Sequence, residues 1–178
     1  GQAVAEVLFG DYNPAGKLPL TFYRNLAQIP DFEDYNMTGR TYRYMKETPL
    51  FPFGHGLSYT TFKYGKLKMN DDKIAAGQNL NLVIPVTNTG SRDGDEVVQV
   101  YLKKMDDTEG PVKTLRAFKR VRIPAGKTVE VKFSLDDTQL EWWDEQSNTM
   151  RFCPGNYTVM IGGTSCEKSL LSRAFTIR

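Results

Sequence analysis

Residues 80–86 read Leu-Asn-Leu-Val-Ile-Pro-Val, with a large aliphatic side chain at every second position. A period of two predicts a β-strand with one buried face, because successive side chains of a strand point to opposite sides of the sheet. A first strand is expected at residues 62–69, which makes seven strands in all. The alternation also returns at residues 98–102, 121–123, 129–135, 157–161 and 175–177.

Turn signals separate these predicted strands, at Asp93-Gly94, at residues 124–126 (Pro-Ala-Gly) and at Pro154-Gly155. No amphipathic helix of useful length lies between them, and only Asp136–Glu145 is expected to form a short helical turn. Short strands at this spacing are typical of a two-sheet sandwich of the immunoglobulin or fibronectin type III kind. Because the Cys…Trp…Cys signature of immunoglobulin domains is missing, we expect a mainly β, fibronectin type III-like antiparallel sandwich over residues 61–178.

The beginning of the chain has a different pattern. A short helix ending at Gly10 as its C-cap is predicted by an apolar stripe at Ala3, Val4, Val7 and Leu8. Residues 13–16, Asn-Pro-Ala-Gly, are expected to form a turn, and residues 18–22 a short extended segment. Because this helix is so short and begins at the first residue, we expect the chain to be part of a longer protein.

Residues 23–60 form a long connector without a clear period. Irregular segments of this length are uncommon inside compact domains, and exposed rings would leave a large apolar surface in water. We therefore expect the connector to wrap over another domain. The sandwich is one such partner, and a longer parent would supply more. The rings concerned are Phe32, Tyr35, Tyr42, Tyr44, Phe51 and Phe53.

Charge and composition exclude several classes of protein. The 178 residues include 23 Lys plus Arg against 21 Asp plus Glu, a net charge of +2, which argues against nucleic acid as a partner. No apolar run reaches the about 18 residues of a membrane span. Residues 1–10 lack the features of a signal peptide, so any such signal would precede Gly1.

The two cysteines, Cys153 and Cys166, lie toward opposite ends of one predicted hairpin. A disulfide would require their Cα atoms to lie within about 7 Å of each other, so two free thiols are expected. Further metal ligands are missing nearby, and we expect no metal site or cofactor.

Acidic residues surround two tryptophans at Glu141-Trp142-Trp143-Asp144-Glu145, which suggests a carboxylate pair on a sugar-stacking platform. We favour a plainer interpretation, in which one tryptophan closes the end of the sandwich and the acids face water. Residues 54–58, Gly-His-Gly-Leu-Ser, lack the third glycine of a phosphate loop and do not match a nucleophile elbow. Their glycines are expected to permit a tight backbone path, and His55, the only histidine, to be structural.

A basic group comprises Lys119 and three arginines, Arg116, Arg120 and Arg122, together with Phe118. Alternation places the arginines on one face of a strand, which we expect to face solvent; docking against an acidic surface of other domains is the functional alternative. The acid pairs at residues 71–72, 106–107 and 136–137 are expected to be turn residues. Asn36 and Asn156 match the N-glycosylation pattern, which matters only in a eukaryotic secretory protein.

Residues 8–19, Leu-Phe-Gly-Asp-Tyr-Asn-Pro-Ala-Gly-Lys-Leu-Pro, resemble the end of the α/β-sandwich domain of family 3 glycoside hydrolases. Residues 40–44 and 49–59 are similar to the connector that follows it in that family. The family's fibronectin-like terminal domain is resembled by residues 88–90 with 96–101, by 115–121 and by 154–159. The blocks cover nearly the whole chain in the family's order. Two departures are His55, where the family often has an aromatic residue, and Ala117, where it often has Gly.

The resemblance implies a parent enzyme that releases terminal β-linked glucose or xylose with retention, in carbohydrate catabolism. Retention requires two carboxyl groups about 5–5.5 Å apart, and both family motifs for them would lie before Gly1. No catalytic, cofactor-binding or metal-binding residue is therefore assigned here. We expect residues 1–22 to be the end of the α/β-sandwich domain, 23–60 the connector and 61–178 the sandwich.

The implied role is a non-catalytic accessory region that packs on the catalytic domains of the same parent, whose substrate is an oligosaccharide or glycoside. The parent is expected to be periplasmic or secreted. The alternative is an independent carbohydrate-binding or adhesive β-sandwich. That function needs a flat row of exposed rings, for which the sequence offers Tyr101, Trp142 and Trp143.

Overall fold

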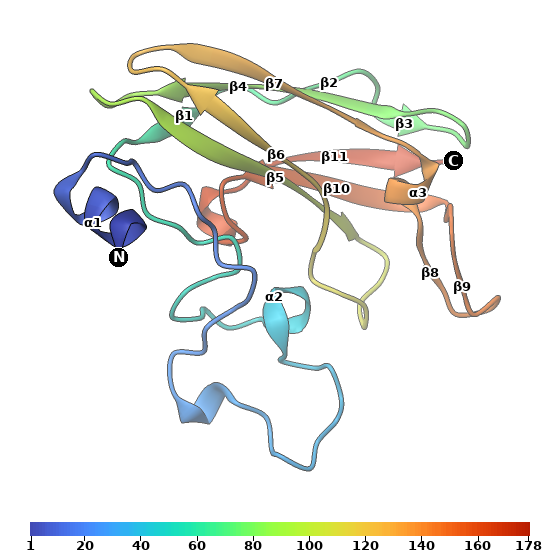
Figure 1. Ribbon diagram of the computed structural model, residues 1–178. Coiled ribbons are helices and arrows are strands. Elements are labelled where there is room, and N and C mark those ends of the chain that lie inside the picture. The colour runs from blue at the N-terminus through green and yellow to red at the C-terminus, as the bar shows by residue number, and fades with distance from the viewer.

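Two β-sheets packed face to face form the body of the molecule in the computed structural model, which describes residues 1–178 (Figure 1). The first sheet is built around β4 (Leu80–Asn88), which pairs with β7 (Thr128–Leu135) on one side and with β1 (Phe62–Tyr64) and β2 (Lys68–Met69) on the other. The second sheet has the order β3-β11-β10-β5-β6. Its strands are β3 (Lys73–Ile74), β5 (Gly94–Lys104), β6 (Thr114–Ile123), β10 (Gly155–Gly162) and β11 (Leu171–Ile177).

The period of two in residues 80–86 is realised along β4. Its register with β7 runs from Leu80 opposite Leu135 to Thr87 opposite Thr128. The four aliphatic side chains of β4 all point into the sandwich and are fully buried: Leu80, Leu82, Ile84 and Val86. The opposite sheet covers them with fully buried side chains from β5 and β10, namely Val98, Val100, Leu102, Tyr157, Val159 and Ile161. The predicted mainly β, fibronectin type III-like sandwich is confirmed.

The strand expected at residues 62–69 is divided into β1 and β2. Both pair with β4 along the same edge, and Pro85 of β4 faces the break between them. Proline has no backbone N–H to donate to a neighbouring strand, so a continuous ladder cannot pass this position. Gly65 crosses close to the proline ring and donates its N–H to Pro85 O at 2.8 Å. A side chain at residue 65 would collide with that ring.

The helical turn expected over Asp136–Glu145 forms only in its first half. Asp136 caps α3 (Asp137–Leu140) through a capping box with Gln139, and buried Leu140 anchors the helix to the core. From Trp142 onward the chain forms a hairpin of β8 (Trp142–Asp144) and β9 (Thr149–Arg151). The expectation is therefore wrong for residues 142–145. Residues 142–144 form a strand instead, in which the side chain of Trp142 points inward and that of Trp143 points outward.

Residues 1–61 contain little regular structure. Helix α1 (Gln2–Phe9) ends at Gly10, whose φ of 81° is the left-handed cap predicted from the sequence. Two short elements follow, η1 (Leu26–Gln28) and α2 (Thr41–Tyr44), and another short turn, η2 (Glu167–Ser169), precedes β11. None of the helices combines the length and apolarity that a membrane crossing requires.

The turn expected at residues 13–16 does not form, and this stretch has no assigned turn or strand. The side chain of Asn13 accepts hydrogen bonds from Ser58 Oγ (2.9 Å) and Tyr59 N (2.8 Å) and donates to Asp93 O (2.9 Å). These long-range bonds hold the stretch between the connector and the end of the sandwich. The segment expected to be extended at residues 18–22 bends at residues 19–20, so the expectation is wrong there, and only Phe22 forms a bridge, with Phe51.

Shortening Ile84 to alanine tests the core. Because Ile84 is fully buried between the sheets, we expect Ile84→Ala to lower the free energy of unfolding by about 2–5 kcal/mol, measured by urea denaturation. The control is Lys132→Ala on an exposed position of the neighbouring β7, expected to change that free energy by less than about 0.5 kcal/mol. Equal effects of the two substitutions would contradict the assigned inward face.

Candidate functional site

The two adjacent tryptophans have opposite environments. Trp142 is 3% exposed, and its ring meets Tyr157 edge to face with centroids 6.0 Å apart. Its Nε1 donates to Asp107 Oδ2 at 2.6 Å. Trp143 is 49% exposed. The plainer interpretation is confirmed for the rings, since one tryptophan closes the end of the core.

The acids beside these tryptophans do not form a catalytic pair. Asp144 Oδ2 accepts from Ser147 Oγ at 2.6 Å and lies 3.2 Å from Arg151 Nη1. The Ser147 hydroxyl, helped by its backbone N–H and by the Arg151 charge, lowers the pKa of the Asp144 carboxyl. A carboxyl held ionised is unsuited to act as a general acid near neutral pH. Asp144 therefore does not simply face water, as expected, but stabilises the β8–β9 turn.

One buried carboxylate lies elsewhere, on β5. Glu96 is 5% exposed, accepts a hydrogen bond from Tyr64 Oη at 2.9 Å and lies 3.4 Å from Lys17 Nζ. Burial raises the pKa of Glu96, and the Lys17 charge opposes that rise. Glu96 is not among the residues predicted from the sequence, although its position has the same parity as the inward-facing Val98 and Val100. Glu96 has a lysine and a tyrosine as its partners and no second carboxylate. Because Glu96 lies on β5 and Tyr64 on β1, this cluster links Lys17 to both sheets.

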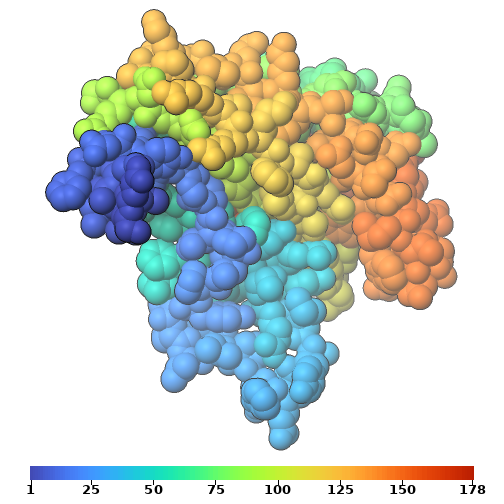
Figure 2. Space-filling model, in the orientation of Figure 1, coloured from blue at the N-terminus to red at the C-terminus, as the bar shows by residue number.

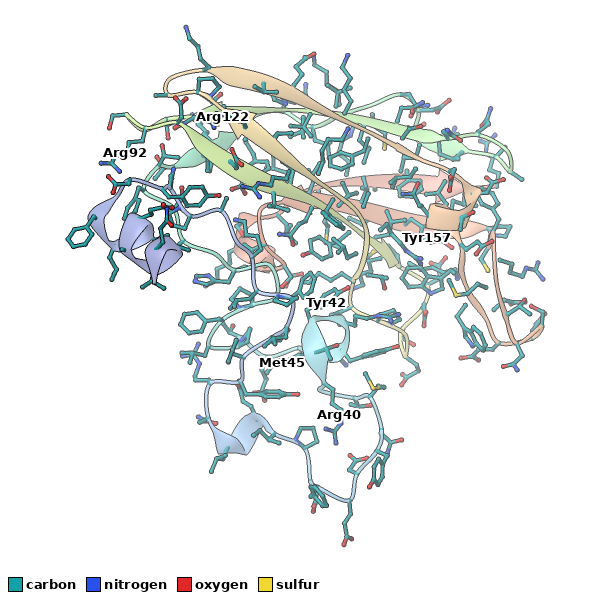
Figure 3. All side chains as sticks on the ribbon, viewed as in Figure 1. Arg40, Tyr42, Met45, Arg92, Arg122 and Tyr157 are labelled. Carbon is teal, nitrogen blue, oxygen red and sulfur yellow. The ribbon has the colours of Figure 1, made fainter.

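The second half of the connector packs on the outer face of the five-stranded sheet. The Tyr42 ring stacks on Phe53 (centroids 4.4 Å apart) and meets Tyr101 edge to face (5.8 Å). Tyr42 Oη also accepts from Leu115 N at 3.2 Å. Figure 3 shows Tyr42 between α2 and the sheet. As a result Tyr101 is completely buried and cannot bind a sugar ring.

The glycine-rich segment at residues 54–58 lies against the same face. Gly54 has a φ of 79°, and a Cβ there would overlap the amide of buried Gln99. This close approach confirms that the glycine permits a tight backbone path. The His55 ring packs on Phe51 at 4.9 Å, and its backbone O accepts from Leu18 N. No cluster of three or more His, Cys, Asp or Glu residues suited to a metal occurs in the molecule.

The first half of the connector and α1 remain uncovered. Figures 1 and 2 show the segment around η1 projecting away from the sandwich. Phe32 is 92% exposed and Tyr35 is 88% exposed. We call this set the outer apolar surface: Val4, Leu8, Phe9, Leu26, Ile29, Phe32 and Tyr35, all exposed. The sandwich therefore covers only part of the aromatic connector.

The basic group on β6 is divided by a β-bulge. The register shifts between Val100 and Tyr101, so Arg116 is left without a partner in the ladder. Its guanidinium turns over the Trp142 ring at 5.4 Å, and Nη2 donates to Glu141 O at 2.6 Å. The prediction of a solvent-facing Arg116 is therefore wrong.

The other two arginines of this group are exposed as predicted and paired within the chain. Arg120 Nη2 lies 2.6 Å from Asp95 Oδ2, and Arg122 Nη2 lies 3.3 Å from Asp93 Oδ2. These local partners leave little unpaired positive charge for a docking partner. Cys153 and Cys166 are free thiols just before and just after β10.

Replacing Glu96 by glutamine tests its buried carboxyl. Because the pKa of Glu96 is raised in the folded state, the wild-type protein loses stability from this group as pH rises from 4 to 7. The glutamine in Glu96→Gln does not titrate. We therefore expect the free energy of unfolding of the variant, minus that of the wild type, to increase as pH rises from 4 to 7. Urea denaturation at both pH values measures this. The control is Glu130→Gln at an exposed position, for which this difference should not depend on pH. The same free-energy difference between Glu96→Gln and wild type at both pH values would refute the raised pKa of Glu96.

Two family profiles match separate parts of the chain. Residues 1–59 match the glycosyl hydrolase family 3 C-terminal domain. Residues 96–165 match the fibronectin type III-like domain. The first match covers α1 and the connector, and the second covers β5 to β10.

Relatives and solved structures extend over nearly the whole chain. A xylan 1,4-beta-xylosidase of Xylanibacter ruminicola is 50% identical over 177 residues, which are 99% of this chain and 20% of the relative. A periplasmic beta-glucosidase of Salmonella typhimurium is 38% identical, over 94% of this chain and 23% of the relative. A β-glucosidase structure from Erythrobacter marinus superposes with a TM-score of 0.82 at 36% identity, over 99% of this chain and 23% of that one.

The chain therefore spans about a fifth of the length of the curated relatives that it matches. The blocks of resemblance named in the sequence and the two domain profiles occur in the same order along the chain. The chain thus belongs to glycoside hydrolase family 3, as the carboxy-terminal region in which the end of the C-terminal domain leads into a fibronectin type III-like sandwich.

Proposed function

We propose that this chain is the non-catalytic carboxy-terminal accessory region of a retaining glycoside hydrolase that releases terminal β-linked glucose or xylose. Its function is to pack on and support the catalytic domains of the same protein. The names of the relatives support the substrate class, since they are xylosidases and glucosidases. The observation that carries the packing role is the outer apolar surface.

The outer apolar surface has the composition of an interface. It combines apolar side chains of α1 with apolar side chains of the connector, and the connector rings Phe32 and Tyr35 are almost fully in water. Apolar side chains exposed to this degree on two segments indicate surfaces that an interaction partner covers. Helix α1 is also attached to the connector and to the sandwich by polar contacts, since Tyr59 Oη donates to Val7 O at 2.6 Å and Arg92 Nη1 to Gly10 O at 2.7 Å. Its apolar stripe is thus free to pack on a further domain.

The catalytic residues of such an enzyme belong, on this proposal, to the domains that precede the chain. Retaining hydrolysis needs a carboxylate nucleophile and a carboxyl acid/base about 5–5.5 Å apart. Glu96 is bound to a lysine and a tyrosine instead, and Asp144 is bound to a serine and an arginine. We therefore assign no catalytic, cofactor-binding or metal-binding residue to the chain.

We propose a division of the chain into three parts. Residues 1–22 complete the preceding α/β-sandwich domain, residues 23–60 connect it to the β-sandwich, and residues 61–178 form that sandwich. The periplasm or the exterior of the cell is the proposed compartment, supported by the periplasmic name of the Salmonella relative. An independent carbohydrate-binding or adhesive module is not favoured, because Tyr101 and Trp142 are buried and no flat row of rings remains.

The isolated chain is expected to show no turnover of aryl β-glucosides or β-xylosides, because the proposal assigns both catalytic carboxyl groups to the preceding domains. A chromogenic assay at micromolar protein, with the intact Xylanibacter ruminicola relative as the positive control, measures this. Hydrolysis that co-purifies with the folded chain and disappears when the chain is unfolded would contradict the proposal that the chain is non-catalytic.

A chimera tests the packing role. The matching fifth of the Xylanibacter ruminicola relative is exchanged for this chain, with or without Phe32→Ser and Tyr35→Ser. In the isolated chain the two substitutions should change the free energy of unfolding by less than about 0.5 kcal/mol each, because both rings are in water. In the chimera each should cost about 3–5 kcal/mol, the range for a ring removed from a packed core, and lower Tm.

The matched control is Phe118→Ser on β6, an exposed ring outside the outer apolar surface. It should leave the Tm of the chimera unchanged. An equal fall in Tm from all three substitutions, or none from any, would contradict the proposal that the outer apolar surface is the interface.

A further inference from the structure

A groove of about 510 Å³ opens where α2, the β5–β6 loop and the β8–β9 hairpin meet. Figure 1 shows these three segments side by side below the second sheet. Arg43 and Tyr44 of α2 line one side of the groove, and Trp143 and Met150 of the hairpin line another. The β5–β6 loop contributes residues 106–111. We call it the Trp143 groove.

The base of the groove is held by hydrogen bonds within the chain. Asp107 accepts from Trp142 Nε1 at 2.6 Å through one carboxylate oxygen and from Gly110 N at 2.7 Å through the other. Arg116 lies over the Trp142 ring and donates to Glu141 O. These contacts join the loop, β6 and the hairpin, so the shape of the groove is formed before any ligand arrives. A preformed site avoids the entropic cost of ordering on binding.

An apolar platform lies at the mouth of the groove. Trp143 and Met150 are cross-strand partners in the β8–β9 hairpin, and they are 49% and 44% exposed. The indole offers a flat apolar face on which the C–H face of a sugar ring can pack. Most ligand sites combine such a platform with a few polar groups that fix orientation.

The polar groups of the groove have both signs of charge and are largely unused. The side chains of Lys104, Glu109 and Glu145 line it and make no hydrogen bond or ion pair within the chain, while the guanidinium of Arg43 contacts only the Tyr44 ring. Unused donors and acceptors therefore lie together in one groove.

This mixture selects the class of ligand. A phosphate would favour cations alone, and a divalent cation would need a cluster of oxygen ligands that is not found here. Hydroxyl groups donate to carboxylates and accept from cations, so a polyhydroxylated ligand satisfies both kinds of side chain at once. An aromatic platform beside such groups matches a sugar.

We propose that the Trp143 groove binds a neutral β-linked oligosaccharide of glucose or xylose units, one ring of which stacks on Trp143. The choice of glucose or xylose rests on the proposed function, whereas the affinity for a neutral oligosaccharide rests on the groove alone. The site differs from the flat row of rings that an independent binding module would need.

Isothermal titration calorimetry of the 178-residue chain with xylotetraose and with cellotetraose tests the proposal. We expect saturable binding of at least one of them, weakened about tenfold or more by Trp143→Ala, the range for loss of a central tryptophan from a binding site. Because Trp143 is half exposed, the variant should fold, which circular dichroism verifies. The control Phe118→Ala removes an exposed ring outside the groove and should bind like wild type.

The paired substitution Glu109→Gln and Glu145→Gln should weaken binding severalfold without changing the fold, since both carboxylates are free to accept from hydroxyl groups. Inorganic phosphate at equal concentration should not compete. Competition by phosphate, absence of saturable binding, or full binding by Trp143→Ala would each overturn the proposal. These titrations use the chain alone. A negative titration therefore rejects the sugar site without affecting the packing role, and a negative chimera experiment rejects the packing role without affecting the sugar site.

Discussion

Strand β5 buries side chains on both of its faces. Val98, Val100 and Leu102 point into the sandwich, while Gln99 and Tyr101 point outward and are 3% and 0% exposed. A strand of a two-sheet sandwich normally has one wet face, so the outer face of β5 needs a cover. The connector supplies that cover with Tyr42, Phe53 and Gly54, and burial of polar groups then requires hydrogen-bond partners. Gln99 donates to Gly163 O and accepts from the Tyr101 hydroxyl, which satisfies them.

This double burial divides the connector into two functional parts. Residues 41–59 are fixed on the sheet by ring stacking and by backbone hydrogen bonds, such as Ser165 N to Phe53 O and Val112 N to Arg43 O. The preceding segment, with Phe32 and Tyr35, has no comparable partner in the chain and projects from the molecule. A rigid docked half thus presents an exposed apolar half in a defined direction. The same docking places α2 beside the β5–β6 loop and so forms one side of the Trp143 groove.

The features that sequence could predict are those carried by a local period. Alternation located β4, β5, β7 and β10 and their inward faces, and Gly10 marked the end of α1. The alternation places Tyr101 on the outward face of its strand and so predicts an exposed ring. In the structure Tyr42 covers this ring from 59 positions earlier in the sequence, and no local pattern can predict such a distant contact. The same reason explains the break at Gly65, caused by Pro85 across the sheet, and the altered direction of Arg116, caused by a register shift. Glu96 was missed because its charge suggested solvent, although its parity placed it inside.

Helix α1 shows why the outer apolar surface requires a partner. An isolated helix of eight residues is unstable in water, because nucleation costs more than so few hydrogen bonds return. The contacts from Tyr59 and Arg92 are surface hydrogen bonds, each contributing about 0.5–1.5 kcal/mol, and they act on the last turn and the cap. No residue of α1 is buried by the sandwich. These polar contacts therefore set the direction of the helix, while on the proposed function most of its stability comes from burial of Val4, Leu8 and Phe9 against a further domain.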